Sequence, residues 1–251
     1  MTRVHLARLA LPLLAALSAA PRAAVIDLYQ GAAGTMPQAQ PWMTFIGLGL
    51  ASSVAGGVSL DTRLHPSLAA GYFNHSLTAA PGTWALKNPA FPDLDPAVGF
   101  TLGFELALPD EDHLSNDRAG FSVILLGDDQ KGIELGFWED RIWAQSGPDF
   151  VQAEGVAVNT LTKTLYELTI RGLNYILNAD GSQVLTGPTR DYTGATPSVD
   201  PYETPGMIFL GDDTSSASAL FTLGSIRLEV PAPPPWWLLP AGLLALHRRR
   251  R

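Results

Sequence analysis

The stretch FTLGFELAL, residues 100–108, decides the fold class of this chain. Side chains of a β-strand point alternately to opposite faces, so an apolar residue at every second position indicates a strand with one buried face. Thr101, Gly103, Glu105 and Ala107 occupy the other face. The alternating apolar residues are Phe100, Leu102, Phe104, Leu106 and Leu108.

Further short apolar runs elsewhere in the sequence predict more strands. Residues 119–126 are apolar on both faces over their second half, as in a central strand. Residues 133–137 and 141–145 flank the pair Glu139-Asp140, which predicts a hairpin with a tight turn. The later strands are expected in LYELTIRG, LNYILN, QVLTG, MIFLG and ALFTLGSIRLEV, and residues 47–96 are expected to form short strands and long loops.

Nothing between residues 25 and 230 shows helical periodicity with caps. Together with 24 glycines and 20 prolines in 251 residues, this predicts an all-β, antiparallel two-sheet β-sandwich in a single domain of residues 25–230. The chain has no cysteine, which excludes thiol catalysis, disulfides and thiolate metal sites.

The charge of the middle of the chain limits its partners. Residues 25–247 contain 9 basic and 24 acidic residues, a net charge of −15. Such a surface repels phosphate backbones, so we expect no nucleic-acid partner. It is compatible with divalent cations.

Residues 1–24 have the order of a secretion signal peptide. Arg3 and Arg8 precede the apolar run 9–17, and small residues follow. A buried helix is the alternative, but a core helix does not require basic residues in front of it at the chain start. We expect export, with signal peptidase cutting between Ala20 and Ala24.

Residues 231–251 combine a proline-rich stop, the apolar run 236–246 and four arginines. Eleven helical residues span about 16 Å, roughly half of the hydrocarbon core of a bilayer. This segment, with Val230 before it, resembles the PEP-CTERM sorting signal, although Ala232 stands where glutamate is usual. The resemblance implies an exosortase-like processing enzyme, an initial tether in the inner membrane and a final place in the cell envelope or outside the cell. An ordinary membrane anchor is the alternative.

Four segments of the domain resemble the bacterial choice-of-anchor Y group. They are SNDRAGFSVILLG (115–127), GIELGFWEDRIWAQSG (132–147), LTGPTRDY (185–192) and FLGDDTSSA (209–217). The strand order also resembles jelly rolls of the concanavalin A and laminin-G type. The resemblance implies a jelly-roll fold and an exported setting, and it brings no assigned activity.

The motif LGDD occurs at 126–129 and again at 210–213, each time after an apolar strand. Adjacent carboxylates supply hard oxygen ligands, so calcium is the one cofactor we consider. The candidates are Asp128, Asp129, Asp212 and Asp213. The alternative is a solvated turn in which the aspartates accept local hydrogen bonds.

A second group mixes arginines, acids and aromatic rings, which suits a saccharide or an extracellular polymer. Alternation puts Trp138 and Trp143 on the polar face of their hairpin, where we expect a shallow site. Arg118 and Arg141 could instead pair with Glu134 or Asp140. The candidate ligand-binding residues are Arg118, Glu134, Trp138, Arg141, Trp143, Arg190, Asp191 and Tyr192.

We assign no catalytic residue from the sequence. A retaining glycosidase needs two carboxylates about 5–5.5 Å apart, and Glu134 and Glu139 fall on opposite faces of a regular strand. The sequence therefore favours a non-catalytic binding or structural module of the envelope or matrix. The alternative is a carbohydrate-active enzyme similar to glycoside hydrolases, which two carboxylates within about 10 Å in an aromatic-lined groove would favour.

Overall fold

The computed structural model describes residues 23–45, 51–77, 84–147, 149–195 and 200–231. The predicted signal peptide and the predicted sorting tail lie outside these residues, except for Ala23, Ala24 and Pro231 at their inner ends. Residues 23–231 cluster as one compact unit. Within the described ranges, no helix has the length and apolarity needed to cross a bilayer.

The described chain forms two large antiparallel sheets and a short ribbon. Sheet A has the order β15-β14-β13-β8-β18-β4-β3, with β1 beside β18. Its strands are β1 (Ala24–Tyr29), β3 (Ala51–Val54), β4 (Gly57–Asp61), β8 (Phe100–His113), β13 (Thr164–Arg171), β14 (Asn174–Ala179), β15 (Ser182–Pro188) and β18 (Ala217–Val230).

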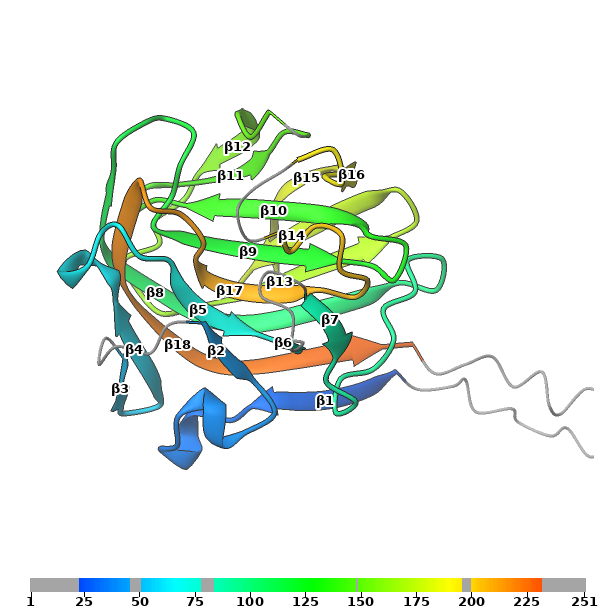
Figure 1. The fold of residues 1–251 in the computed structure, drawn as a ribbon, viewed down its shortest axis with the longest axis horizontal. Coiled ribbons are helices and arrows are strands. Elements are labelled where there is room, and N and C mark those ends of the chain that lie inside the picture. Colours follow the sequence, from blue (N-terminus) through cyan, green and yellow to red (C-terminus); the bar gives the residue numbers. More distant parts are fainter. Residues whose placement is uncertain (1–22, 46–50, 78–83, 148, 196–199, 232–251) are drawn as a thin grey trace, which may run out of the picture. The chain divides into compact units, whose positions relative to one another are not determined.

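Sheet B has the order β12-β11-β10-β9-β17-β5-β2, with β16 beside β10. Figure 1 shows β9, β10 and β17 running side by side. The strands of sheet B are β2 (Met43–Phe45), β5 (Ala70–Phe73), β9 (Phe121–Leu126), β10 (Lys131–Phe137), β11 (Arg141–Gln145), β12 (Gln152–Ala157), β16 (Arg190–Asp191) and β17 (Ile208–Asp212). The ribbon pairs β6 (His75–Leu77) with β7 (Trp84–Lys87).

The two-sheet antiparallel sandwich predicted from the sequence is confirmed. Helical geometry in the described ranges is limited to three 3₁₀ turns, η1 (Gly31–Ala33), η2 (Pro37–Ala39) and η3 (Thr62–Leu64). The predicted hairpin is present, because β10 pairs with β11 from Phe137 opposite Ile142 onward. Strand β9 is buried on both faces, as expected of a central strand.

The main core lies between the two sheets. The alternating residues of the opening stretch, Phe100 to Leu108, belong to it. Aromatic rings join the layers: Phe104 of β8 lies 6.1 Å from Phe137 of β10, and Phe121 of β9 lies 4.7 Å from Phe221 of β18, between ring centroids. Edge-to-face packing of this kind adds to the burial of the rings themselves.

The outer faces of the two sheets differ. That of sheet A carries charged pairs, such as Arg227 with Glu167 at 2.7 Å and Lys163 with Glu105 at 2.9 Å. That of sheet B carries a second apolar cluster in which residues from the 192–207 region pack on β5, β9 and β17. The buried members of this cluster are Phe73, Ile124, Leu126, Tyr192, Ala195, Tyr202, Met207 and Phe209. Sheet B is therefore covered on both faces over β5, β9 and β17.

One strand runs further than its apolar pattern predicts. The alternation ends at Leu108, yet β8 continues to His113 because it stays paired with β18, with Asp112 opposite Ser218. This extension brings Glu111 and His113 next to the hairpin of β10 and β11. The backbone N–H of Glu111 donates to Oε1 of Glu139, at the turn of that hairpin.

Candidate functional site

The candidate site is centred on Glu134, which lies on the outer face of β10 and is 2% exposed. Tyr202 donates its hydroxyl hydrogen to Oε2 of Glu134 at 2.5 Å. The backbone N–H of Glu134 donates to the Tyr192 hydroxyl at 3.2 Å, and that hydroxyl donates to the carbonyl of Gln145 at 3.0 Å. Tyr192 and Tyr202 belong to the segment of residues 192–207 that covers sheet B, called the covering segment below. They fix the position of a buried acid.

Three aromatic rings cover this acid. Tyr192 and Tyr202 have ring centroids 5.2 Å apart, and Phe150 lies 5.9 Å and 5.2 Å from them. Their packing removes water from the Glu134 carboxyl. Burial without a countercharge favours the protonated form of an acid.

Asp213, which follows β17, is the acidic partner of Glu134. Burial and then the negative charge of Asp213 raise the pKa of Glu134 well above its usual range. Burial also raises the pKa of Asp213, and this is only partly opposed by hydrogen bonds from Ser122 and Glu134 and by the charge of Arg118. Both directions favour one proton held by the Glu134–Asp213 pair, because two neighbouring carboxylates oppose each other's ionisation.

A stack of two aromatic rings lies at the Phe137 end of β10, about 13 Å from Glu134 at strand rise. The His113 ring is parallel to the Trp138 ring, with an interplanar angle of 2° and centroids 4.1 Å apart. Trp138 is half-buried, and its Nε1–H donates to the Arg118 carbonyl at 2.8 Å. His113 Nδ1 lies 2.8 Å from Oε2 of Glu111, whose pKa is raised by burial. These hydrogen bonds hold the two rings in place, and both side chains stay partly exposed to solvent.

The expected orientation of Trp143 is confirmed, and its expected exposure is wrong. Its neighbours Ile142 and Ala144 face the main core, so Trp143 faces outward as alternation predicts. It is nevertheless 0% exposed, because its ring packs closely over Gly136 and against the Trp138 ring, with centroids 5.9 Å apart. Trp143 therefore packs against Trp138 and has no contact with solvent.

The other predicted ligand-binding residues are dispersed around this centre. Arg118 donates from Nη1 to the carbonyls of Asp117 at 2.6 Å and Phe150 at 2.9 Å. Arg141 is half-buried against Gly155 of β12, and its Nε is buried without a hydrogen-bond partner. Over the described ranges, neither arginine forms an ion pair with Glu134 or Asp140, which was the alternative interpretation.

Arg190 and Asp191 lie at the far end of β10, where Arg190 is opposite Gly132. Arg190 forms an ion pair with Glu154 at 2.5 Å. The exposed Asp191 accepts hydrogen bonds from the backbone and hydroxyl of Thr193. These two residues make local contacts at the Lys131 end of β10 and do not contact Glu134.

The two LGDD motifs lie at opposite ends of the pair β9–β17. Ile208 is opposite Leu125 and Gly211 is opposite Ser122, so at strand rise Asp128 and Asp212 are separated by roughly 20 Å. The four aspartates therefore cannot ligate one ion together. Among the described residues no group of three or more histidines and acids has the arrangement of a metal site.

The members of each LGDD pair also differ. Asp129 is exposed and accepts the backbone N–H of Lys131 at 3.1 Å, and Asp128 accepts that of Leu94 at 3.0 Å. Asp212 is fully buried, and burial raises its pKa to about 8. The first pair forms a turn, whereas the second pair has one fully buried member, Asp212, and one half-buried member, Asp213.

Several residues of the centre were missed by the sequence analysis. Tyr202 lies in an irregular segment without a periodic pattern, and Ser122 and Gln145 read as ordinary strand positions. His113 lies beyond the apolar alternation of its strand. Only a knowledge of strand order would have brought these residues together with Glu134.

No protein-family model matches this sequence. No curated protein matches it either. Among solved structures, the chain is similar to the carbohydrate esterase vb_24B_21 from the Shiga toxin-encoding bacteriophage phi24B, with a TM-score of 0.52 and 13% identity over 83% of this chain and 100% of that chain. It is also similar to the Crh5 transglycosylase in complex with NAG, with a TM-score of 0.51 and 12% identity over 85% of this chain and 87% of that chain.

These similarities show the fold. At such low identity they carry no residue of either protein over to this chain. The choice-of-anchor Y resemblance and the sorting tail stay predictions.

Proposed function

We propose that this protein is an exported, non-catalytic module of the cell envelope or extracellular matrix that binds a saccharide or a similar extracellular polymer. The proposal depends on the half-exposed stack of Trp138, at the end of β10, and His113, at the end of β8, next to Arg118. Flat aromatic surfaces flanked by polar groups suit sugar rings, which have apolar faces and hydroxyl edges.

Two further observations support a carbohydrate ligand. The solved structures with the same fold are named as a carbohydrate esterase and as a transglycosylase in complex with NAG. Arg118 and Arg141 bring positive charge to a domain that is otherwise acidic, and both lie on the side of the sheet that carries Trp138.

Replacing Trp138 tests this proposal. We expect Trp138→Ala to reduce retention on envelope polysaccharide in affinity electrophoresis at least about tenfold, because the ring supplies the contact surface. Trp138→Phe is the matched control, since it keeps a ring but loses the hydrogen bond to Arg118, and it should retain part of the binding. If the folded Trp138→Ala variant is retained as strongly as the wild type, the proposed role of the Trp138 ring in binding is refuted.

The alternative is a glycoside hydrolase-like enzyme that uses Glu134 and Asp213. The close contact of these two carboxyls is what favours it. Against it, the carboxyls of a retaining pair stand about 5–5.5 Å apart with the substrate between them, whereas here they interact directly and Tyr202 covers Glu134. Turnover of aryl glycosides that is lost in Glu134→Gln, a variant that keeps the shape of the side chain, would favour the enzyme.

The export part of the proposal rests on sequence alone. Residues 1–24 would be removed by signal peptidase, and residues 231–251 would be recognised by an exosortase-like enzyme that ends the membrane tether. Cell fractionation with an antibody to the domain tests this, and a cytoplasmic pool as the only product would refute it.

A further inference from the structure

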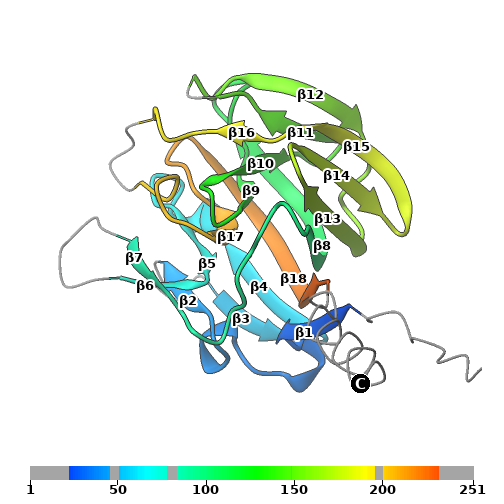
Figure 2. The same cartoon turned by 90° about the vertical axis from the view of Figure 1, so that its right-hand side faces the viewer.

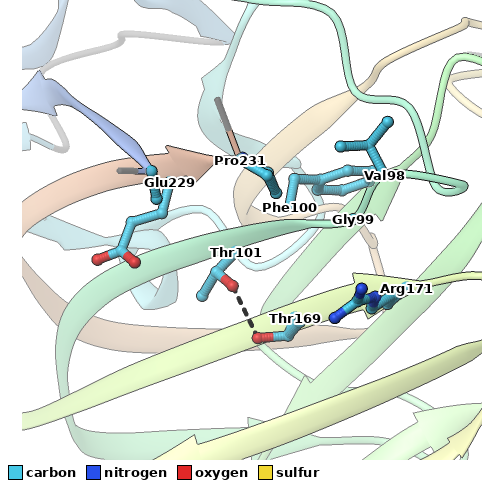
Figure 3. Close-up of a pocket in the computed structure, with 9 residues that line it drawn as sticks. Val98, Gly99, Phe100, Thr101, Thr169, Arg171, Glu229 and Pro231 are labelled. Carbon is cyan, nitrogen blue, oxygen red and sulfur yellow. Dashed lines mark hydrogen bonds between the residues drawn. The ribbon is translucent and has the colours of Figure 1, made fainter. Parts of the chain in front are cut away.

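A shallow cavity of about 170 Å³ lies on the outer face of sheet A, away from the candidate site on sheet B. Figure 3 shows its lining, with Thr101 between Glu229 on one side and Arg171 on the other. Glu229 and Thr169 are both cross-strand neighbours of Thr101, so the three residues form one row across β18, β8 and β13. Adjacent strands are about 4.8 Å apart, so this row is about 10 Å long, the scale of one sugar ring with its substituents.

The floor of the cavity is rich in unused hydrogen-bonding capacity. The Thr101 and Thr169 hydroxyls are hydrogen-bonded to each other at 2.8 Å, which leaves at least one donor or acceptor position free on each. Oε1 of Glu229 lies 3.5 Å from Nε of Arg227, so the carboxylate charge is partly neutralised. The carboxylate can still accept hydrogen bonds from hydroxyl groups. Val98, which is 40% exposed, and Pro231 give the cavity an apolar side.

Arg171 supplies a positive charge without a protein partner. Its guanidinium forms no hydrogen bond or ion pair with any described residue, whereas Arg63, Arg190 and Arg227 each pair with an acid. The aliphatic part of the Arg171 side chain lies against Gly99, where an added Cβ would be 3.1 Å from Cγ of Arg171. Gly99 also has a φ of +91°, which disfavours a side chain at this position. The backbone at residue 99 thus leaves room for the Arg171 side chain along the edge of the cavity.

We propose that this cavity is a second ligand site, which binds a single sugar residue bearing a carboxylate, a hexuronate. Arg171 forms two parallel hydrogen bonds with the carboxylate, a geometry for which the guanidinium is suited. The two threonine hydroxyls and Glu229 bind the ring hydroxyls, and Val98 and Pro231 contact the apolar face of the ring. The net charge of −15 over residues 25–247 opposes a polyanion, so the site takes one acidic residue and not a run of them.

Calorimetric titration of the full chain with glucuronate tests the proposal. Glucose is the matched ligand without a carboxylate, and acetate is the carboxylate without a ring. We expect millimolar binding of glucuronate that is at least about tenfold tighter than binding of either control, because charge-assisted hydrogen bonds contribute more than neutral ones.

Two variants assign the binding to this cavity. Arg171→Met should weaken glucuronate binding at least about tenfold. Lys131→Met, which removes one exposed positive charge elsewhere, should leave it unchanged. Thr169→Val should weaken binding of the sugar acid without affecting any binding of acetate.

Four further outcomes would overturn the proposal, and a fifth would separate it from the proposed function. Equal binding of acetate reduces the site to a simple anion site, and equal binding of glucose removes the role of the carboxylate. Absence of saturable glucuronate binding refutes the site itself. Loss of glucuronate binding in Trp138→Ala would place the ligand on sheet B. If instead Trp138→Ala loses polysaccharide retention while glucuronate still binds, the two sites are independent and each proposal stands or falls separately.

Discussion

The hydroxyl of Tyr202 donates to Oε2 of Glu134 at 2.5 Å, joining residues 68 positions apart in the chain. This bond closes the covering segment onto sheet B. It also satisfies one oxygen of a carboxyl group that has almost no contact with water. A hydroxyl group in an irregular segment therefore helps to hold that segment on β10.

We expect Tyr202→Phe to lower the free energy of unfolding by about 1–3 kcal/mol, because a buried acceptor is left without its donor. Tyr72→Phe is the matched control, since the Tyr72 hydroxyl is buried and has no hydrogen-bond partner. Its removal should be nearly neutral. Urea unfolding of both variants measures the difference, and equal costs would contradict the role given to the Tyr202 hydroxyl.

Stability should fall as the pH rises from about 4 to about 8. Burial, followed by weaker contributions that include the negative charges of Asp213 and Glu111, raises the pKa of Asp212 from 3.8 to about 8. Above pH 4 the unfolded chain loses this proton while the folded chain keeps it, so the unfolded state is increasingly favoured until the folded group also ionises near pH 8.

Asp212→Asn should flatten this pH dependence and raise stability at pH 8 by at least about 1 kcal/mol. The asparagine can still accept the backbone N–H of Thr214 through its side-chain oxygen, as Oδ1 of Asp212 does at 3.1 Å. Glu134 and Asp213 contribute in the same direction, so part of the slope should persist. Unfolding curves at several pH values provide the measurement, and an unchanged slope in the variant would assign the pH dependence to other groups.

The two tryptophans of the hairpin should differ in their contribution to stability. Trp143 is fully buried, so Trp143→Ala should cost about 3–5 kcal/mol through lost burial and a cavity. Trp138 is half-buried, and Trp138→Ala should cost about 1–2 kcal/mol. Denaturant unfolding of both variants tests this, and a small cost for Trp143 would mean that its ring is not part of the packed face.

Calcium binding stays a prediction, and the turn at Asp128 and Asp129 is the place to test it. Asp93 and Asp95 lie close enough to add to the burial effect that raises the pKa of Asp128. A cation there would relieve this repulsion. Calcium at ten times its dissociation constant should stabilise the domain by about 1.4 kcal/mol. Asp128→Asn should abolish this response in thermal unfolding, whereas Asp212→Asn, at the other end of the strand pair, should keep it.

The fold could be predicted because its core strands alternate so regularly. The stretch from Phe100 to Leu108 lies in the main core as its pattern indicates. Strand β12 was not predicted, since Gln152 to Ala157 are half-buried or exposed and carry no apolar period. Strand β8 was predicted too short because its last residues are held by pairing with β18 and not by burial.

The site could be predicted only in part. Glu134 and Tyr192 were placed in one group, and they are in contact. Asp213 was named as a candidate calcium ligand, with a solvated turn as the alternative. Its interaction with Glu134 was not foreseen, because contacts between β10 and the end of β17 depend on strand order and not on sequence spacing. Alternation separates the two faces of a sheet, but it does not tell whether a distant segment covers the outer one. Nor does alternation show that nearby residues can bury an outward-facing ring, as Gly136 and Trp138 do for Trp143.

The first and last strands of the domain are direct neighbours, with Ala24 opposite Val230 (Figure 2). Because the two ends of the domain meet at one rung of the ladder, a force that pulls Ala23 and Pro231 apart loads the hydrogen bonds of β1 one pair at a time. Strands pulled in this unzipping geometry separate at low force, whereas strands sheared along their length resist with all their bonds together. We therefore expect the domain to yield under tension first at β1.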